Sequence, residues 1–345
     1  MQSNKNADIS GDIAQFSEHL RTCIDSRQTL LAANGPAAAL RLFNGFYEGL
    51  PNLTIDIYAQ TLVFSNYSRT PESLRPWLDT ALNVCQSLAL ADSALVKTRA
   101  ANSDAERRGV FAWGNHLPAW IEEYQTRYAL DLRLHQDEGF YLDTRGLRQW
   151  LKNNLAGKSV LNCFAYTGSL GIAALAGGAS SVLQTDREAR YLELAEESQR
   201  LNHLIGMQTL VSDFFRAVSK LKRDERLFDC VILDPSIYSE SSAGKVDLTR
   251  NWLGLVNKVR PLVAHEGLLI VINNGLFIPG SSVMDQLATL ARSGYIRFEK
   301  RIDVPQDFIG FEETIRSQPP ADPGPFNHPT KISVMRVTRK DKRRA

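Results

Sequence analysis

The sequence predicts an α/β protein in which a small α+β domain precedes a seven-stranded, doubly wound sheet. From residue 140 onward, short apolar runs alternate with amphipathic segments, which is typical of parallel strands joined by helices. Before that point, strand-like runs follow one another between helices without this regular alternation. At 345 residues, two domains are the natural expectation, and we place them at residues 1–130 and 131–345.

The composition is that of an ordinary water-soluble globular chain, with 43% hydrophobic and 23% charged residues. No apolar stretch reaches the length of a membrane span, and the acidic N-terminal residues Asp8, Asp12 and Glu18 do not fit a signal peptide. The cysteines lack metal-ligand spacing, so we expect reduced thiols, no metal site and a cytoplasmic protein. They are Cys23, Cys85, Cys163 and Cys230.

The net charge of +2 neither requires nor excludes a nucleic-acid partner. Basic residues are concentrated in the tail from Arg336 to Arg344. Such a run either touches phosphates or is simply solvated, and we take it as solvated.

The first domain is expected to combine helices with antiparallel strands. Helical periodicity runs from Asp12 to Asn34 and ends at Gly35-Pro36. The elements expected after it are strands at 40–43, 53–58 and 62–67, a helix at 71–88, a strand at 94–99, a polar loop at 102–109 and further β structure at 122–134.

The second domain is expected to contain seven strands. They lie at 160–164, before Asp186, and at 207–213, 228–233, 268–272, 295–304 and 331–338; the helices between them lie at 172–176, 188–204, 214–226, 247–265 and 281–294. The last connection is a loop with many prolines, so we expect strand seven to run antiparallel beside strands five and six. That arrangement is the methyltransferase variant of the Rossmann-like fold.

The stretch 159–186 carries the clearest functional signal. A strand, a tight turn at Thr167-Gly168, a helix and a second strand ending on Asp186 follow one another. Ligands of open parallel sheets bind at the carboxyl edge, where the strand order switches. Gly168 would let a ligand approach the backbone, and Asp186 could accept hydrogen bonds from two ribose hydroxyls. This pattern predicts a nucleoside site, and a βαβ core unit without a ligand is the alternative.

The sequence of the turn from Phe164 to Gly171 indicates which kind of nucleoside would bind. A dinucleotide site has Gly-x-Gly-x-x-Gly to seat a pyrophosphate, whereas this turn has two glycines and an aromatic residue. A nucleoside without phosphates fits better, and S-adenosylmethionine is the common one. NAD is a distant alternative.

Three elements resemble the bacterial large-subunit (23S) ribosomal RNA methyltransferase family. They are Gly139–Arg145 (Gly-Phe-Tyr-Leu-Asp-Thr-Arg), Val160–Ser169 and Asp234–Ser239 (Asp-Pro-Ser-Ile-Tyr-Ser), and the resemblance covers roughly residues 40–275. It implies a class I S-adenosylmethionine-dependent enzyme acting on cytosine C5 or guanine N7. The chain departs from the family in having Ser236 where a second proline is usual, and no PUA RNA-binding domain is found in its first 40 residues.

The resemblance also implies a set of cofactor-binding residues. Asp213 would neighbour the adenine edge, with helix N-capping as the alternative. Asp143 and Arg145 would lie over the cofactor, with an ion pair between the domains as the alternative. The full set is Tyr141, Asp143, Arg145, Asn162, Phe164, Tyr166, Thr167, Gly168, Ser169, Asp186, Arg187, Asp213, Phe214 and Asp234.

The expected catalytic residues are Asp234, Pro235, Tyr238 and Asn273. Asp234 would lie beside the transferring methyl group, and Pro235 would fix the turn. Tyr238 would offer a ring on which a flipped-out base could stack, unless it is a core aromatic.

The positions of the cysteines argue against a mechanism with a cysteine nucleophile. Cytosine C5 needs a cysteine thiolate to add to the ring, and no cysteine follows strand four or strand five. Cys163 and Cys230 precede their strand tips, while Asn273-Asn274 resembles the guanine-N7 branch.

We therefore expect direct in-line methyl transfer to a nucleic-acid base, with RNA, and rRNA in particular, as the partner. The small domain would help to place the substrate. Transfer to a small molecule or protein, and a non-catalytic cofactor-binding RNA module, are the alternatives. If RNA binds, a set of arginines should gather on one face, namely Arg69, Arg99, Arg107, Arg108 and Arg145.

Overall fold

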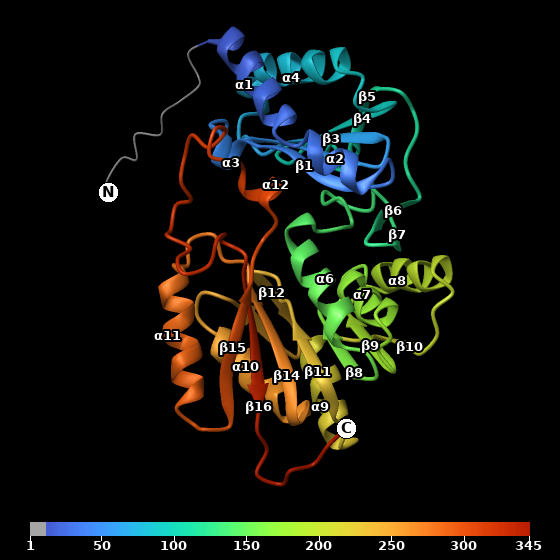
Figure 1. The fold of residues 1–345 in the computed structure, drawn as a ribbon, viewed down its shortest axis with the longest axis vertical. Helices are drawn as coiled ribbons and strands as arrows, with labels where there is room; N and C mark the ends of the chain where they lie inside the picture. The colour runs from blue at the N-terminus through green and yellow to red at the C-terminus, as the bar shows by residue number, and fades with distance from the viewer. Residues whose placement is uncertain (1–11) are drawn as a thin grey trace. The chain divides into compact units, whose positions relative to one another are not determined.

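The computed structural model describes residues 12–345, which form two compact units (Figure 1). The first unit ends at Leu142 and also contains Pro305–Pro319, and the second contains Asp143–Val304 and Pro320–Ala345. The chain thus passes between units after Leu142, Val304 and Pro319, whereas the sequence suggested one boundary after residue 130. The acidic start at Asp8 lies outside the described residues. Among residues 12–345, no helix has the length and apolarity needed to cross a membrane.

The first unit is built on a five-stranded sheet with the order β1-β2-β3-β4-β5. Neighbouring strands are antiparallel except for the parallel pair β3 and β4. The strands are β1 (Ala39–Asn44), β2 (Leu53–Tyr58), β3 (Thr61–Asn66), β4 (Ser93–Thr98) and β5 (Val110–Trp113), and a separate hairpin joins β6 (Trp120–Glu123) to β7 (Thr126–Ala129). The sequence predicted β1 to β4 within a residue or two and missed β5.

Helices α1 and α4 cover one face of this sheet and share its apolar core. The helices of the unit are α1 (Ile13–Asp25), α2 (Gln28–Asn34), α3 (Gly45–Glu48), the 3-10 helix η1 (Pro71–Leu74), α4 (Arg75–Ser87), α5 (Asp104–Arg108) and α12 (Gln306–Ile309). The prediction of one helix over 12–34 was wrong. The chain turns at Ser26, whose N–H and hydroxyl both bond to the Thr22 carbonyl, so α1 ends before α2 begins. The polar loop predicted at 102–109 contains α5.

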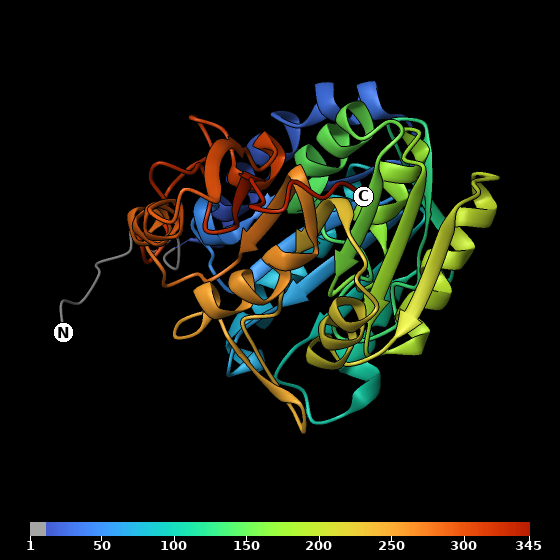
Figure 2. The same cartoon turned by 90° about the horizontal axis from the view of Figure 1, so that it is seen from below.

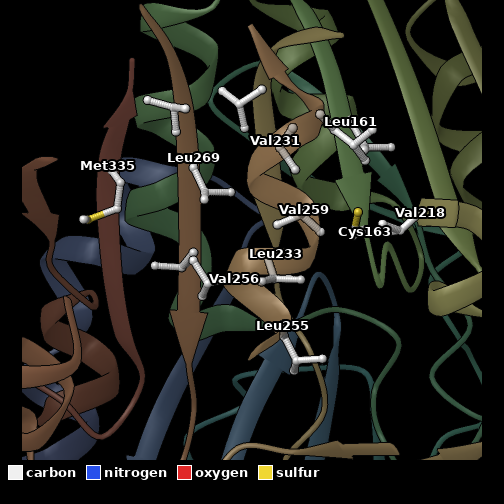
Figure 3. Close-up of a cluster of buried hydrophobic side chains, with 14 of the residues drawn as sticks. Leu161, Cys163, Val218, Val231, Leu233, Leu255, Val256, Val259, Leu269 and Met335 are labelled. Atoms are coloured by element: carbon white, nitrogen blue, oxygen red, sulfur yellow. The ribbon is translucent and has the colours of Figure 1, made fainter. Parts of the chain in front are cut away.

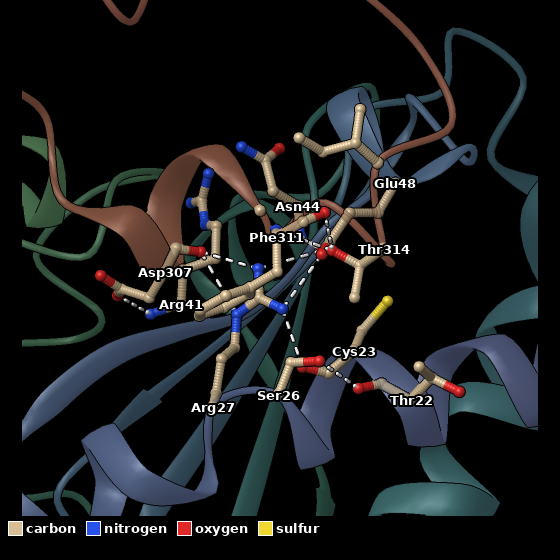
Figure 4. Close-up of polar contacts among 12 residues, drawn as sticks. Thr22, Cys23, Ser26, Arg27, Arg41, Asn44, Glu48, Asp307, Phe311 and Thr314 are labelled. Carbon is tan, nitrogen blue, oxygen red and sulfur yellow. Dashed lines mark hydrogen bonds and ion pairs between the residues drawn. The ribbon is translucent and has the colours of Figure 1, made fainter.

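Arg27, between α1 and α2, lies at the centre of a buried polar cluster (Figure 4). Its guanidinium donates to both carboxylate oxygens of Glu48, at 3.0 and 3.2 Å, and to the backbone oxygen of Asp307 at 2.8 Å. The Asp307 carboxylate in turn accepts from the backbone N–H of Arg41 at 3.0 Å. Asp307 belongs to the segment that returns late in the chain, so this segment completes the interior of the first unit.

Replacing Arg27 should therefore destabilise the protein strongly. We expect Arg27→Met to lower the free energy of unfolding by about 3–5 kcal/mol, because it leaves the buried Glu48 carboxylate without its partner. The control is Arg75→Met, since Arg75 is 67% exposed in its pair with Asp79 and should contribute less than about 1 kcal/mol. Urea unfolding followed by circular dichroism measures both. Equal effects of the two substitutions would contradict the importance of the buried pair.

The second unit contains a seven-stranded sheet with the order β10-β9-β8-β11-β14-β16-β15. Its strands are β8 (Ser159–Cys163), β9 (Ser181–Asp186), β10 (Met207–Val211), β11 (Phe228–Leu233), β14 (Val263–Asn273), β15 (Ile296–Ile302) and β16 (Lys331–Val337). Strands β10, β9, β8, β11 and β14 run parallel to one another, and β16 lies antiparallel between β14 and β15. The predicted fold class and the antiparallel seventh strand are confirmed.

Helices lie on both faces of this sheet (Figure 2). The helices are η2 (Leu142–Thr144), α6 (Arg145–Asn154), α7 (Ser169–Ala176), α8 (Ala189–Leu201), α9 (Phe214–Arg223), α10 (Trp252–Val259), η3 (Arg260–Leu262) and α11 (Gly280–Ala291). The sequence did not predict a helix at the position of α6. The helix predicted over 247–265 was too long, because 238–247 forms the hairpin of β12 (Tyr238–Ser241) and β13 (Gly244–Asp247), and β14 already begins at Val263.

Successive strand residues enter two separate cores. Leu161, Val231 and Leu269 pack with α9, α10 and α11 in the cluster shown in Figure 3. Their neighbours Val160 and Ile232 point to the opposite face and pack with α6 and α7. A central strand buried on both faces explains the continuous apolar runs in the sequence.

Candidate functional site

The register of the parallel strands brings their tips into one row. Leu233 at the end of β11 stands opposite Cys163 of β8 and Val271 of β14, and Cys163 stands opposite Thr185 of β9. The residues that follow these positions, among them Phe164, Asp186 and Asp234, therefore emerge side by side at the carboxyl edge. The strand order reverses here, between β8 and β11, as the nucleoside-site prediction requires.

The loop after β8 has an unusual backbone that Asp186 holds in place. Phe164, Tyr166 and Gly168 all adopt left-handed conformations, with φ of 57°, 51° and 77°. Left-handed residues at alternate positions form concave backbone surfaces that bind ligands, and non-glycine residues there are strained. The Asp186 carboxylate accepts from the N–H of Tyr166 at 2.9 Å and from that of Glu188 at 3.1 Å. These backbone bonds lower the pKa of Asp186, but burial outweighs them and raises it.

Gly168 is required by packing as well as by its backbone conformation. A Cβ at this position would stand 2.4 Å from the Cβ of Ala195 and 2.7 Å from Nε2 of Gln184. The same amide group would clash with a Cβ at Gly171. The protein's own side chains therefore require a glycine at position 168, and the approach of a ligand to its backbone stays a prediction.

Two aromatic rings stand beside this loop. Phe164 stacks on the buried ring of Phe214 with centroids 4.6 Å apart and an interplanar angle of 24°. Asp213 caps the N-terminus of α9, since its carboxylate accepts from the N–H groups of Phe215 at 2.9 Å and Arg216 at 3.4 Å. The capping alternative for Asp213 is therefore what the structure shows. Asp213 nevertheless directly precedes Phe214, one of the two stacked rings.

Asp234, directly after β11, has an environment unlike that of a surface carboxylate. Burial, together with the smaller effect of the nearby negative charge of Asp143, raises its pKa to about 7. Asp143 itself accepts a hydrogen bond from the Thr330 hydroxyl at 2.7 Å. The tip of β11 thus carries a carboxyl group that titrates near neutral pH.

The end of β14 presents two amide side chains with unused hydrogen-bonding atoms. The side-chain oxygen of the buried Asn273 accepts from the N–H of Gly275 at 3.1 Å. Among the described residues, the Asn273 amide nitrogen and the Asn274 side-chain oxygen have no partner, although both atoms are buried. The Asn162 side-chain oxygen on β8 is likewise unpaired within residues 12–345. Burying polar atoms without hydrogen-bond partners costs free energy. A polar ligand bound at this edge would supply the missing partners.

Lys331 is a member of this edge that sequence reasoning missed. It stands opposite Asn273 in the sheet, is almost fully buried, and donates to the carbonyls of Gly275 at 2.9 Å and Pro329 at 2.5 Å. Burial lowers its pKa to about 8. Its signal was available in the sequence, because a lysine opens the largely apolar final strand. The antiparallel direction of that strand brings its start to the carboxyl edge.

Other predicted residues lie at varied positions. Tyr238 is 54% exposed on the β12–β13 hairpin, with its hydroxyl bonded to Glu240 at 2.8 Å, so it is not a core aromatic. Arg187 is exposed beside Glu188, and Tyr141 is an exposed residue of the other unit. The remaining positions are Asn162, buried in β8; Thr167, buried in the loop; Ser169, which opens α7; Arg145, buried at the start of α6; and Pro235, buried after β11.

An open groove of about 620 Å³ lies elsewhere, along β10 between α8 and α9. Charged residues of both signs line it, including Glu196, Arg200, Lys220 and Asp224. None of the predicted site residues lies in its wall.

Comparison with known proteins identifies the family of the chain. Residues 41–316 match the family described as S-adenosylmethionine-dependent methyltransferase. The chain belongs to this family. The cofactor of this methyltransferase is S-adenosylmethionine, so the predicted cofactor and the family resemblance are confirmed.

Relatives with curated names are about one-third identical to this methyltransferase. Ribosomal RNA large subunit methyltransferase I of Aeromonas salmonicida is 32% identical over 263 residues, which cover 75% of this chain and 66% of the relative. The protein of the same name from Aeromonas hydrophila is 33% identical over 267 residues, with the same coverage. The matched region thus spans 66% of these relatives.

Solved structures share the fold. A methyltransferase crystallised with S-adenosylhomocysteine (SAH) superposes with a TM-score of 0.81 at 23% identity, covering 96% of this chain and 83% of that one. A methyltransferase from Streptococcus mutans gives a TM-score of 0.79 at 22% identity over the same shares.

The chemistry of the edge fits S-adenosylmethionine. When bound, the cofactor supplies an electrophilic methyl group on a cationic sulfonium. The carboxylates Asp143 and Asp234 suit a positive charge and would repel a pyrophosphate. Asp186 has oxygens that can accept further hydrogen bonds from ribose hydroxyls.

Asp186→Asn tests this use of the edge. We expect it to weaken binding of both S-adenosylmethionine and SAH by about ten- to a hundredfold, as loss of hydrogen bonds to a charged group would. Isothermal titration calorimetry measures the affinities, with Asp285→Asn on the exposed face of α11 as the control. Unchanged affinity in a folded Asp186 variant would contradict the role of this carboxylate.

Proposed function

We propose that this methyltransferase methylates a base of ribosomal RNA by direct in-line transfer, without a cysteine nucleophile. The observation that carries the proposal is the edge formed by β11 and β14. There a carboxyl group titrating near neutral pH, Asp234, and the amides of Asn273 and Asn274 occupy the strand tips. The names of the relatives, which are ribosomal RNA methyltransferases, support the choice of substrate.

The cysteines support non-covalent transfer. Cys23, Cys85, Cys163 and Cys230 are all buried and unpaired. Burial raises the pKa of Cys163 to about 12, and it raises that of Cys230 further. A thiol with such a pKa holds its proton at neutral pH and is a poor nucleophile.

The amides support a purine acceptor of the guanine-N7 kind. The Asn273 amide nitrogen can donate and the Asn274 oxygen can accept, and a guanine edge offers the complementary carbonyl and N–H. N7 carries an in-plane lone pair at neutral pH, so the chain need only orient the base and exclude water. In this proposal Pro235 fixes the turn after Asp234, and the exposed ring of Tyr238 stacks on the extruded base.

The same proposal assigns the cofactor. The loop from Asn162 to Ser169 would wrap its methionine part, and Asp186 would bind the ribose. Phe164 and Phe214 would face the adenine, with Asp213 beside them. Asp143, Arg145 and Arg187 would lie beside it, and the first unit would help to place the RNA.

Most of the arginines expected on an RNA-binding face already have carboxylate partners or are buried. Arg99 pairs with Asp137 at 2.7 Å, and Arg107 and Arg108 both contact Asp104. Arg145 is buried in the second unit. This keeps transfer to a small molecule as the second candidate.

Labelled methyl transfer distinguishes the two candidates. We expect the purified protein to move labelled methyl groups from S-adenosylmethionine to large-subunit ribosomal RNA, with the label recovered in one nucleotide after nuclease digestion and mass spectrometry. Cys163→Ser and Cys230→Ser should each retain more than about half of this activity, because neither thiol ionises. Asn273→Ala should lower it at least about tenfold. Label in a small-molecule extract but not in RNA would overturn the RNA assignment, and loss of activity in a folded cysteine variant would overturn non-covalent transfer.

The pKa of Asp234 makes a separate prediction. Below about pH 7 its carboxyl group is protonated, and above pH 7 it is an anion that attracts the cationic sulfonium. The affinity for S-adenosylmethionine relative to uncharged-sulfur SAH should therefore increase as the pH rises from 6 to 8. Asp143→Asn should move this change to lower pH, since it removes the charge that raises the pKa. A ratio that does not vary with pH would contradict an ionising Asp234 beside the sulfonium.

A further inference from the structure

The second unit carries a strongly basic surface at the opposite end of its sheet from Asp234. Three segments meet there: the end of α9 before β11, the end of α10 with η3 before β14, and the tail after β16. All three adjoin the amino edge of the sheet, because β11 and β14 begin there and the antiparallel β16 ends there. Figure 1 shows the C-terminal segment beside the end of α9.

Contacts between the segments establish this juxtaposition. Arg343 in the tail donates to the Glu225 carbonyl at 3.3 Å and pairs with its carboxylate at 3.4 Å. Arg339 donates to the Pro261 carbonyl at 2.7 Å, and the His265 N–H donates to the Arg343 carbonyl at 2.7 Å. The tail is thus held against the sheet by side-chain and backbone bonds, while residues 340–345 remain exposed, as the sequence suggested.

The acidic residues of this surface are already paired with cations. Asp224 pairs with Lys220 at 2.5 Å, Glu225 with Arg343, and Asp341 with Arg339 at 2.8 Å. A set of exposed cations remains that forms no ion pair with any carboxylate of the described residues. We call this set the basic end surface, and it consists of Lys222, Arg226, Lys258, Lys340, Lys342 and Arg344.

Two of these cations, Lys222 on α9 and Lys258 on α10, are near enough to repel one another. The Lys258 ammonium also stands 5.5 Å from the ring centroid of Phe215 on α9. Partial burial, and then the charge of Lys258, lower the pKa of Lys222. Like charges held close together without an acid between them raise the local positive potential. A polyanion bound across both lysines would relieve the repulsion and release its own counterions.

We propose that the basic end surface is a second RNA-binding surface. It binds the phosphate backbone of the substrate RNA at a distance from the base that is methylated. The inference rests on the proposed function, since RNA is the polyanion that this enzyme would meet. Phosphate contacts of this kind position a nucleic acid without reading its sequence. The six residues of β11 separate the two ends of the sheet by about 20 Å, so an RNA that engages both ends must extend well beyond the target nucleotide.

The residues of the surface favour RNA over a membrane. Membrane-surface segments combine basic residues with large apolar side chains that enter the lipid. None of the exposed large apolar side chains among the described residues belongs to 220–226, 258–262 or 339–345. The surface therefore has charge for phosphates but no apolar side chains to insert.

Removing the two adjacent lysines tests the proposal. Lys222→Gln/Lys258→Gln should weaken binding of a large-subunit ribosomal RNA fragment by about ten- to a hundredfold at 0.1 M salt, measured by fluorescence anisotropy. The slope of log affinity against log salt should fall by about two, one for each lost phosphate contact. In methyl transfer to the same fragment, KM should rise by a similar factor while kcat stays unchanged, because neither lysine is among the residues proposed to hold the cofactor or the base.

The matched control is Arg200→Gln/Arg297→Gln, which removes the same charge from arginines that already face Glu197 and Glu266. We expect it to leave the salt slope and KM unchanged. Thermal unfolding verifies that both variants are folded.

The proposed RNA-binding role of the basic end surface would be overturned if the two variants had equal effects, or if the lysine variant showed no change. Methyl transfer to RNA by the wild type would still support the proposed function in that case. Absence of any transfer to RNA by the wild type would instead overturn the proposed function. Binding to anionic phosphatidylserine vesicles that depends on both lysines, with RNA binding unaffected, would assign the surface to lipid.

Discussion

The register between β8, β9, β11 and β14 is the constraint on which the rest of the second unit depends. Cys163, Thr185, Leu233 and Val271 stand opposite one another, so the polar residues that follow them emerge at one edge. A slip of one residue in any pair would turn core side chains to the wrong face. The separate clusters on the two faces of the sheet prevent such a slip, because each strand supplies alternate residues to both. The apolar cores thus determine where the polar site stands.

Within this frame, the site depends on a few polar bonds that hold strained backbone in place. The loop after β8 adopts left-handed conformations at Phe164 and Tyr166, which would relax if the loop were free. The Asp186 carboxylate prevents this by accepting from the Tyr166 N–H, and Ala195 closes the other side of Gly168. The same carboxylate that can bind a ribose therefore also shapes the loop. Affinity and loop geometry are coupled through one side chain.

Much of the second unit could be predicted from the sequence because its signals are local. Continuous apolar runs mark strands buried on both faces, and Asp186 and Asp234 directly follow two of them. The β12–β13 hairpin was missed because it is short and largely exposed, so no apolar period marks it. Contacts between distant positions were equally hidden. Nothing near Asp307 indicates that its carbonyl accepts from Arg27, which stands 280 positions earlier. Lys331 reaches the site only because β16 runs antiparallel.

The distribution of charge in the second unit follows from this topology. At the carboxyl edge, Asp143, Asp186 and Asp234 stand around the strand tips, where a cationic cofactor would be favoured and phosphates disfavoured. At the amino edge, the cations of α9, α10 and the tail exceed the acids available to pair with them. Screening limits each field to about 10 Å at ordinary ionic strength, so the two ends act independently across the length of β11. An RNA backbone repelled by the acidic edge can therefore be held by the other end. This separation would let one unit bind a cation and a polyanion together.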